Sequence, residues 1–173
     1  MTAPSIAPLI DAFGRIRETV EQVLDGLSPE DLSVRLDPDA NSVGWLVWHL
    51  TRIQDDHLAD IAGTPQVWHA DGWEKRFELA YSADATGYGQ SSKDVAAFRG
   101  VSAELLAEYH AAVHDRTVDH LATLDAEDLG RVVDDSWDPP VTLGVRLVSV
   151  ISDDLQHVGQ AAFVRGVVRR QRG

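Results

Sequence analysis

Four long amphipathic segments dominate the sequence, and no run of alternating apolar and polar residues competes with them. They cover about residues 5–26, 41–62, 102–124 and 142–170. Apolar residues in the first recur three or four positions apart, the spacing of a helix with one buried face. These residues are Leu9, Ile10, Phe13, Ile16, Val20, Val23 and Leu24. Four helices without a sheet predict an all-α four-helix bundle, with residues 1–173 as a single domain.

Helix start and stop signals agree with these segments. The candidate N-terminal caps are Asn41 or Ser42, Ser102 and Thr142. Gly63 stands where the second segment should end, because glycine accepts the left-handed backbone that closes a helix. The run Ser28-Pro29-Glu30-Asp31 combines a cap, a proline and an acidic first turn, which predicts a short turn or helix.

A long loop of about residues 63–92 separates the second and third segments, followed by a short helical piece near 93–98. Its aromatic residues argue for an ordered structure, because disordered segments contain few of them. They are Trp68, Trp73, Phe77, Tyr81 and Tyr88. Long ordered loops often form lids or pocket walls, which is one interpretation of this loop. The alternative is that its aromatic side chains simply pack it onto the bundle.

Charge and composition exclude several classes of function. The formal net charge of −13 disfavours nucleic acid and anionic membrane surfaces as partners. A basic cluster of Arg165, Arg169, Arg170 and Arg172 fits a helix C-terminus better than a nucleic-acid arm. The chain has no cysteine, so any thiol chemistry must use a thiol from a small molecule. No apolar run reaches the roughly 20 residues of a membrane span. The N-terminus lacks signal-peptide features, so a cytoplasmic location is expected.

His49 lies in the most apolar part of the second segment, where an unpaired polar group costs about 1–3 kcal/mol. A metal ion would satisfy a buried imidazole at this position. The fourth segment offers Asp153 and His157, which are four residues apart and therefore on one helix face. Two imidazoles and one carboxylate suit zinc, nickel or iron(II). From spacing alone, Asp153 and His157 also fit an ordinary surface pair.

Other histidines offer competing sites. His110 and His114 have the same four-residue spacing on the third segment, and His120 follows. We expect His110 to face a pocket, but the charged neighbours of His114 and His120 predict that these two are solvated. His57 lies eight residues past His49, about 12 Å along a helix, so the two cannot share a metal. Asp56 returns close to the face of His49 and is expected at a pocket mouth.

Two long motifs resemble the DinB-like superfamily, and its mycothiol-dependent transferase branch in particular. They are "NSVGWLVWHLTRIQDDHLADIAG" and "WDPPVTLGVRLVSVISDDLQHVGQAAFVRG", supported by "QVWHADGWEKRFEL" and "GYG". The resemblance implies a four-helix bundle, a homodimer and a divalent metal at one end of the core. It assigns His49, Asp153 and His157 as the metal ligands. The superfamily usually has His or Glu where this chain has Asp153, whose side chain is about 1.5 Å shorter than that of Glu.

The resemblance also implies a function. A divalent metal, zinc first and nickel or iron as alternatives, would activate a low-molecular-weight thiol, mycothiol, for attack on an electrophilic small molecule in detoxification. A thiol-dependent isomerase, a metal-dependent hydrolase and a non-catalytic, stress-associated metal-binding bundle remain open alternatives. The candidate substrate-pocket residues are Trp45, Asp56, Trp73, Arg76, Tyr88, Arg146 and Gln160. Arg146 either contacts a polar substrate or pairs with an acid.

Overall fold

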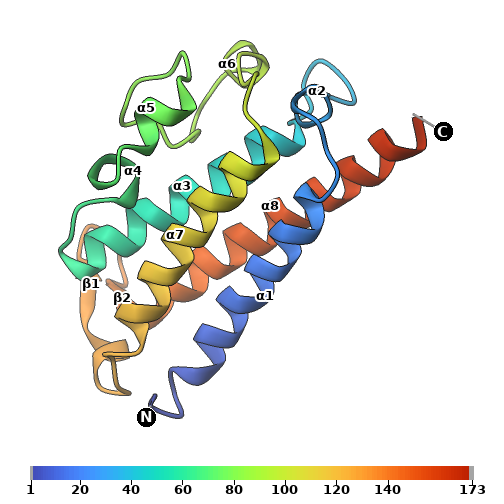
Figure 1. The fold of residues 1–173 in the computed structure, drawn as a ribbon. Helices are drawn as coiled ribbons and strands as arrows, with labels where there is room; N and C mark the ends of the chain where they lie inside the picture. Colours follow the sequence, from blue (N-terminus) through green and yellow to red (C-terminus); the bar gives the residue numbers. More distant parts are fainter. Residues whose placement is uncertain (1, 172–173) are drawn as a thin grey trace.

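A computed structural model describes residues 2–171 and confirms the four-helix bundle (Figure 1). Its long helices are α1 (Ala7–Leu24), α3 (Val43–Ala62), α7 (Ala103–Leu121) and α8 (Leu143–Gln171). Both α1 and α3 pack against α7 and α8, so α7 and α8 lie diagonally across the bundle. In Figure 1, α3 and α8 run in opposite directions along their shared contact, which we call the α3/α8 seam. Arg172 of the basic cluster lies outside the described residues.

Short elements connect the long helices. The helical ones are α2 (Pro29–Leu32), α4 (Val67–Ala70), α5 (Trp73–Phe77), α6 (Ser92–Ala96) and the 3₁₀ helix η1 (Asp128–Gly130). The strands β1 (Val132–Asp134) and β2 (Val141–Thr142) form an antiparallel pair before α8, in which Val132 pairs with Thr142 and Asp134 with Val141. Two strands of this length carry too few residues for an alternating pattern, so no sequence signal indicates them.

The helix caps are those that the sequence indicates. Ser42 Oγ accepts a hydrogen bond from the Trp45 N–H at the start of α3. Ser102 Oγ accepts one from the Leu105 N–H at the start of α7. Gly63 ends α3 in the left-handed conformation, with a φ of 65°. Within the described residues, no helix is long and apolar enough to cross a membrane.

The long loop is ordered because its aromatic residues pack against the bundle. Trp68, Trp73 and Phe77 are buried, and their ring centroids lie 5.2–5.7 Å from that of Tyr109 on α7. Aromatic clusters of this kind each bury a large apolar surface. The loop is therefore held on α7 by aromatic packing. For these three side chains the structure supports packing onto the bundle, and not the wall of a pocket.

The histidines of α7 lie deeper than the sequence suggests. His110 is almost fully buried, and burial lowers its pKa to about 3, so its imidazole is neutral. The prediction that His114 is solvated is wrong, because its side chain is only 9% exposed. Its acidic neighbour Asp115 points to another face of the helix, since consecutive residues are about 100° apart. His120 is half-buried at the end of α7.

We expect His110→Leu to remove a source of acid sensitivity. The unfolded chain binds a proton at His110 below its ordinary pKa of 6.5, whereas the folded chain does not until near 3. Stability contributed by the neutral form is therefore lost as pH falls through this window. Urea unfolding should show the wild type losing about 2 kcal/mol relative to the variant between pH 7 and pH 5. Parallel pH dependences of the two proteins would contradict the buried, neutral state of His110.

Candidate metal centre

His49 of α3 and Asp153 and His157 of α8 come together in the α3/α8 seam. One candidate ligand atom from each residue lies within 4.8 Å of the other two. The imidazole centroids of His49 and His157 are 4.8 Å apart, and Nε2 of His157 lies 3.5 Å from Oδ1 of Asp153. Within residues 2–171, no other group of three or more His, Asp or Glu side chains meets in this way.

Hydrogen bonds at the Nδ1 atoms orient both imidazoles. Nδ1 of His49 lies 2.6 Å from the carbonyl oxygen of Thr86, and Nδ1 of His157 lies 3.1 Å from Oε1 of Gln160. Both oxygens can only accept, so each Nδ1 carries the proton and donates it. In the neutral rings Nε2 then holds the free lone pair. Metal-binding histidines show this arrangement, with the second nitrogen donating to a carbonyl or carboxylate.

Asp153 completes a donor set that fits a divalent cation. Its Oδ2 is buried and has no hydrogen-bond partner among the described residues. A buried carboxylate oxygen without a partner is costly, and a cation would satisfy it. The residues present therefore fit a metal: two imidazole nitrogens and one carboxylate oxygen, with positions left for further ligands.

The electrostatics of the cluster favour the metal-binding protonation state in two of its three residues, His49 and Asp153. Burial lowers the pKa of His49, with the nearby His157 adding to the effect. Burial disfavours ionisation of Asp153, but contact with His157 and the charges of both histidines outweigh it and lower the pKa of this carboxyl. Its contact with Asp153 raises the pKa of His157. A neutral His49 and an ionised Asp153 are the forms that bind metal.

The end of the long loop covers the imidazole of His49. The ring of Trp45, one turn earlier on α3, stacks on it with centroids 4.7 Å apart and planes 18° apart. Gly87 lies against both rings with a φ of 95°, and a Cβ there would come within 2.6 Å of Nδ1 of His49. Nε1 of Trp45 donates to Oε1 of Gln90, 2.8 Å away. The loop thus closes directly over the ligand.

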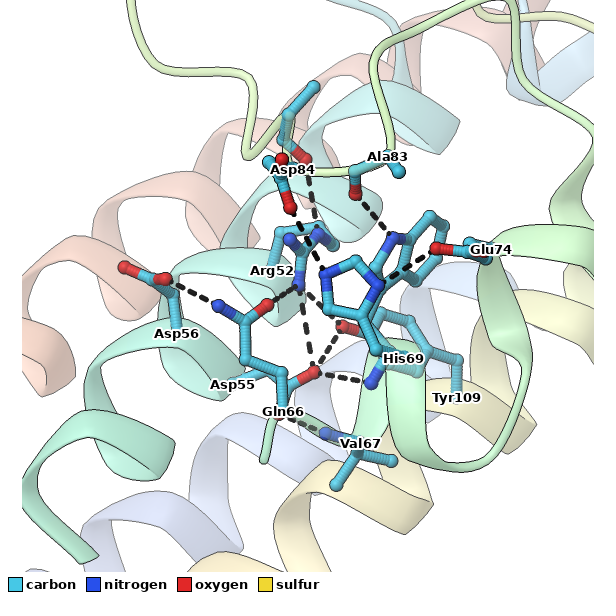
Figure 2. Close-up of polar contacts among 12 residues, drawn as sticks. Arg52, Asp55, Asp56, Gln66, Val67, His69, Glu74, Ala83, Asp84 and Tyr109 are labelled. Atoms are coloured by element: carbon cyan, nitrogen blue, oxygen red, sulfur yellow. Dashed lines mark hydrogen bonds and ion pairs between the residues drawn. The ribbon is translucent and has the colours of Figure 1, made fainter. Parts of the chain in front are cut away.

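A buried polar network holds this loop to α3 (Figure 2). Arg52 is fully buried, and its Nε donates to the Ala85 carbonyl at 3.1 Å, next to Thr86. Its Nη1 donates to Oε1 of Gln66 at 2.8 Å. Sequence reasoning missed this role of Arg52, although an arginine one helical turn from both Trp48 and Asp55 was a signal for it. Arg52 ties both ends of the loop to one helix.

Asp55 balances the charge of Arg52 and holds α4. Its two carboxylate oxygens each accept a 2.8 Å bond from the backbone N–H groups of Val67 and Trp68, and Oδ2 also accepts from the Tyr109 hydroxyl at 2.9 Å. Oδ2 lies 3.6 Å from Nη1 of Arg52. Burial raises the pKa of Asp55, while these hydrogen bonds oppose the shift. With its carboxylate fully bonded, Asp55 is a structural residue.

A second polar group lies along the seam, on the side of Asp153 toward the N-terminus of α8. Nη2 of Arg146 donates to Oδ2 of Asp134 on β1 at 2.7 Å, and Nη1 lies 3.3 Å from Nδ1 of His57. Arg146 thus pairs with an acid, one of its two expected roles. Burial and then the charge of Arg146 lower the pKa of His57. Oδ1 of Asp56 accepts a hydrogen bond from Gln66, so this carboxylate faces the loop.

The sequence matches the family model for mycothiol-S-transferases over residues 8–170, almost the whole chain. The chain belongs to the mycothiol-S-transferase family. A crystal structure of a conserved protein from Enterococcus faecalis is similar to this family member, with 28% sequence identity and a TM-score of 0.90. The alignment covers 97% of this chain and 98% of that one. The comparison with curated proteins gave no match.

The structure does not bring every pocket candidate of this mycothiol-S-transferase family member to the cluster. Trp73 packs against Tyr109, and Arg76 lies over the Trp73 ring and pairs with Glu108 of α7. Both are thus engaged with α7 rather than with the seam. The side chain of Tyr88 is 89% exposed beside Gly87. Trp45 and Gln160 contact the histidines directly.

We expect Gly87→Ala to weaken metal binding, because its Cβ would displace His49 from the Thr86 carbonyl. Gly89→Ala is the control: its φ of 71° is also in the left-handed region, but a Cβ there meets no atom within 4 Å. Calorimetric titration with nickel or zinc should show affinity falling by about 10- to 100-fold in Gly87→Ala and little in Gly89→Ala. Equal losses in the two variants would mean that the loop matters only through its backbone strain.

Proposed function

We propose that this protein is a divalent-metal-dependent thiol S-transferase that uses mycothiol as its co-substrate. The observation that carries the proposal is the convergence of His49, Asp153 and His157, with both Nδ1 atoms already hydrogen-bonded. Membership of the mycothiol-S-transferase family supports the choice of reaction and of thiol. The chain has no cysteine, so the nucleophilic sulfur has to come from a bound small molecule.

The transfer forms a thioether from a thiol and an electrophile. The sulfur forms a bond to the electrophilic carbon, the thiol proton goes to solvent, and a leaving group departs with its bonding pair. A bound divalent metal would favour the ionised thiolate form of a coordinating thiol at neutral pH. His49, Asp153 and His157 would hold that metal, and zinc, nickel and iron(II) all accept this donor set. Thr86 and Gln160 fix the two imidazole rings.

The surroundings of the cluster support a reaction rather than storage of a metal. Trp45 and Gly87 cover one face of His49 and exclude water there. A protected, pre-oriented set of ligands is the arrangement that metal catalysis needs. The homodimer implied by the family resemblance remains a prediction. Exposed Val145, Val148 and Leu155 on α8 are the apolar side chains that it would bury.

We expect His49→Ala and His157→Ala to lose both metal and thiol transfer. Elemental analysis of untagged protein should find about one divalent ion per wild-type chain and far less in either variant. His69→Ala is the control, because His69 is a partly exposed histidine that pairs with Glu74 outside the cluster. If both cluster variants kept the metal and His110→Ala lost it, the metal site would lie near His110, and the assignment to the seam would be wrong.

The reaction itself is tested with a panel of thiols. Mycothiol, bacillithiol and glutathione are each incubated with an alkylating agent, and thioether formation is followed by mass spectrometry. We expect mycothiol to be preferred and the rate to fall to background in His157→Ala. Bound metal without thioether formation would favour the non-catalytic bundle. Hydrolysis or rearrangement of the electrophile without a stable conjugate would favour the hydrolase or the isomerase.

A further inference from the structure

The α3/α8 seam changes character at the metal centre. Toward the N-terminus of α8 it is polar, with Arg146, His57 and Asp134 bonded to one another. Toward the C-terminus of α8 the same two helices line an open groove of about 430 Å³. Because α3 and α8 run in opposite directions (Figure 1), the start of α3 lies at this end of the seam. The other wall of the groove is formed by Leu46 of α3 and by Leu36, Ala40 and Asn41, which precede that helix.

The groove is apolar and carries no charged side chain among its lining residues, although the chain has a net charge of −13. Its walls include Leu36 and Leu46 on one side and Phe163 and Val164 on the other. Phe163 is 67% exposed, so a large apolar ring at this site stands open to solvent. Gly159 also lines the groove, and a Cβ there would meet no atom within 4 Å.

Gln160 joins the groove to the metal centre. It lines the groove, and its Oε1 accepts the hydrogen bond from Nδ1 of His157. On α3, Leu46 lies three residues before His49, so the groove starts one helical turn from both histidines. Val164 is seven residues beyond His157, about 10 Å along α8. An N-hexylacetamide group, taken from its reactive carbon to the end of the hexyl chain, spans that distance.

We propose that this groove binds the neutral, apolar part of the electrophile, and so selects hydrophobic substrates for the transfer. The inference rests on the proposed function, because it assigns one side of the same site. The groove adjoins the metal centre, and this identifies its occupant. When the electrophilic carbon lies at the cluster, the substituent on that carbon extends along the groove. Charged groups are disfavoured there, because the lining offers them no partner of opposite charge. The polar side of the seam is left for the thiol.

A second cavity, of about 180 Å³, lies between α3 and α7. Its lining includes Leu58, Val113 and His120 but none of the three residues of the metal centre. An apolar substituent bound there would not lie beside the reacting carbon. Of these two, the groove along α8 is the one that adjoins the metal centre and can influence the choice of electrophile.

The binding test needs no turnover. N-phenyl-1-naphthylamine is a neutral probe whose fluorescence rises in apolar sites, and it is titrated into wild type, Gly159→Leu and Ala162→Leu. Leucine at 159 fills the groove, whereas Ala162 is exposed on the same helix but does not line it. We expect affinity to fall by about tenfold or more in Gly159→Leu and to stay within about twofold in Ala162→Leu. Absence of binding, or equal effects of the two variants, would overturn the proposal.

The selectivity test uses mycothiol with N-ethyl-, N-butyl- and N-hexyl-2-chloroacetamide, which share one reactive carbon. In each, the C–S bond forms, chloride leaves with the C–Cl electron pair, and the thiol proton goes to solvent. We expect kcat/KM to rise about two- to threefold per added methylene, and this rise to vanish in Gly159→Leu but persist in Ala162→Leu. Turnover that is indifferent to chain length would overturn the groove assignment and leave the transferase intact. Absence of any turnover would overturn the assignment as a transferase. The probe titration alone would then decide whether the groove binds apolar groups.

A second copy of the chain is the competing occupant. Sedimentation velocity of wild type and Phe163→Ser separates the two cases, because Phe163 stands in the groove and is exposed. An unchanged oligomeric state with weaker probe binding supports a substrate groove. Dissociation of a wild-type dimer by Phe163→Ser, with no probe bound by the wild type, would identify the groove as a subunit interface and overturn the proposal.

Discussion

Burying an imidazole is costly unless it is hydrogen-bonded or ligated, and the centre of this protein is arranged around that cost at His49. The Thr86 carbonyl satisfies one nitrogen, and the second belongs to the cluster with Asp153 and His157. The first bond exists only while the long loop stays against α3. Arg52 and Asp55, both buried, hold the loop there through backbone groups of residues 67, 68 and 85. A structural network within the bundle therefore supports the geometry of the candidate metal centre in the seam.

Much of the fold was accessible from the sequence because local signals agreed with the helical pattern. The second segment was expected over about 41–62, and α3 spans Val43–Ala62, with Ser42 and Gly63 as its ends. The sequence indicates the three candidate ligands by two signals. His49 is a polar residue in a strongly apolar helical segment, and Asp153 stands four residues before His157. Their convergence is a property of how α3 packs on α8, and spacing within either helix does not encode it.

What the sequence could not reveal depends on backbone and on tertiary packing. Thr86 contributes a carbonyl oxygen, which every residue possesses, so nothing in its identity pointed to His49. The charged neighbours of His114 predict exposure, but its burial depends on the packing of α7 against α1, which local composition does not indicate. The aromatic residues of the loop signalled order correctly. Whether they faced a ligand or Tyr109 depended on where the loop folds back.

The two helices that form the centre differ in how many of their positions should tolerate amino-acid substitution. Fifteen of the twenty residues of α3 are buried, so most replacements along it disturb packing whatever their relation to the site. On α8, by contrast, Asp153 and His157 stand among exposed neighbours such as Ser152 and Gln156. In a saturation mutagenesis screen, intolerance at a position of α3 would therefore carry little information about chemistry. On α8, an intolerant residue outside its eight buried positions, such as Asp153 or His157, would point to function rather than packing.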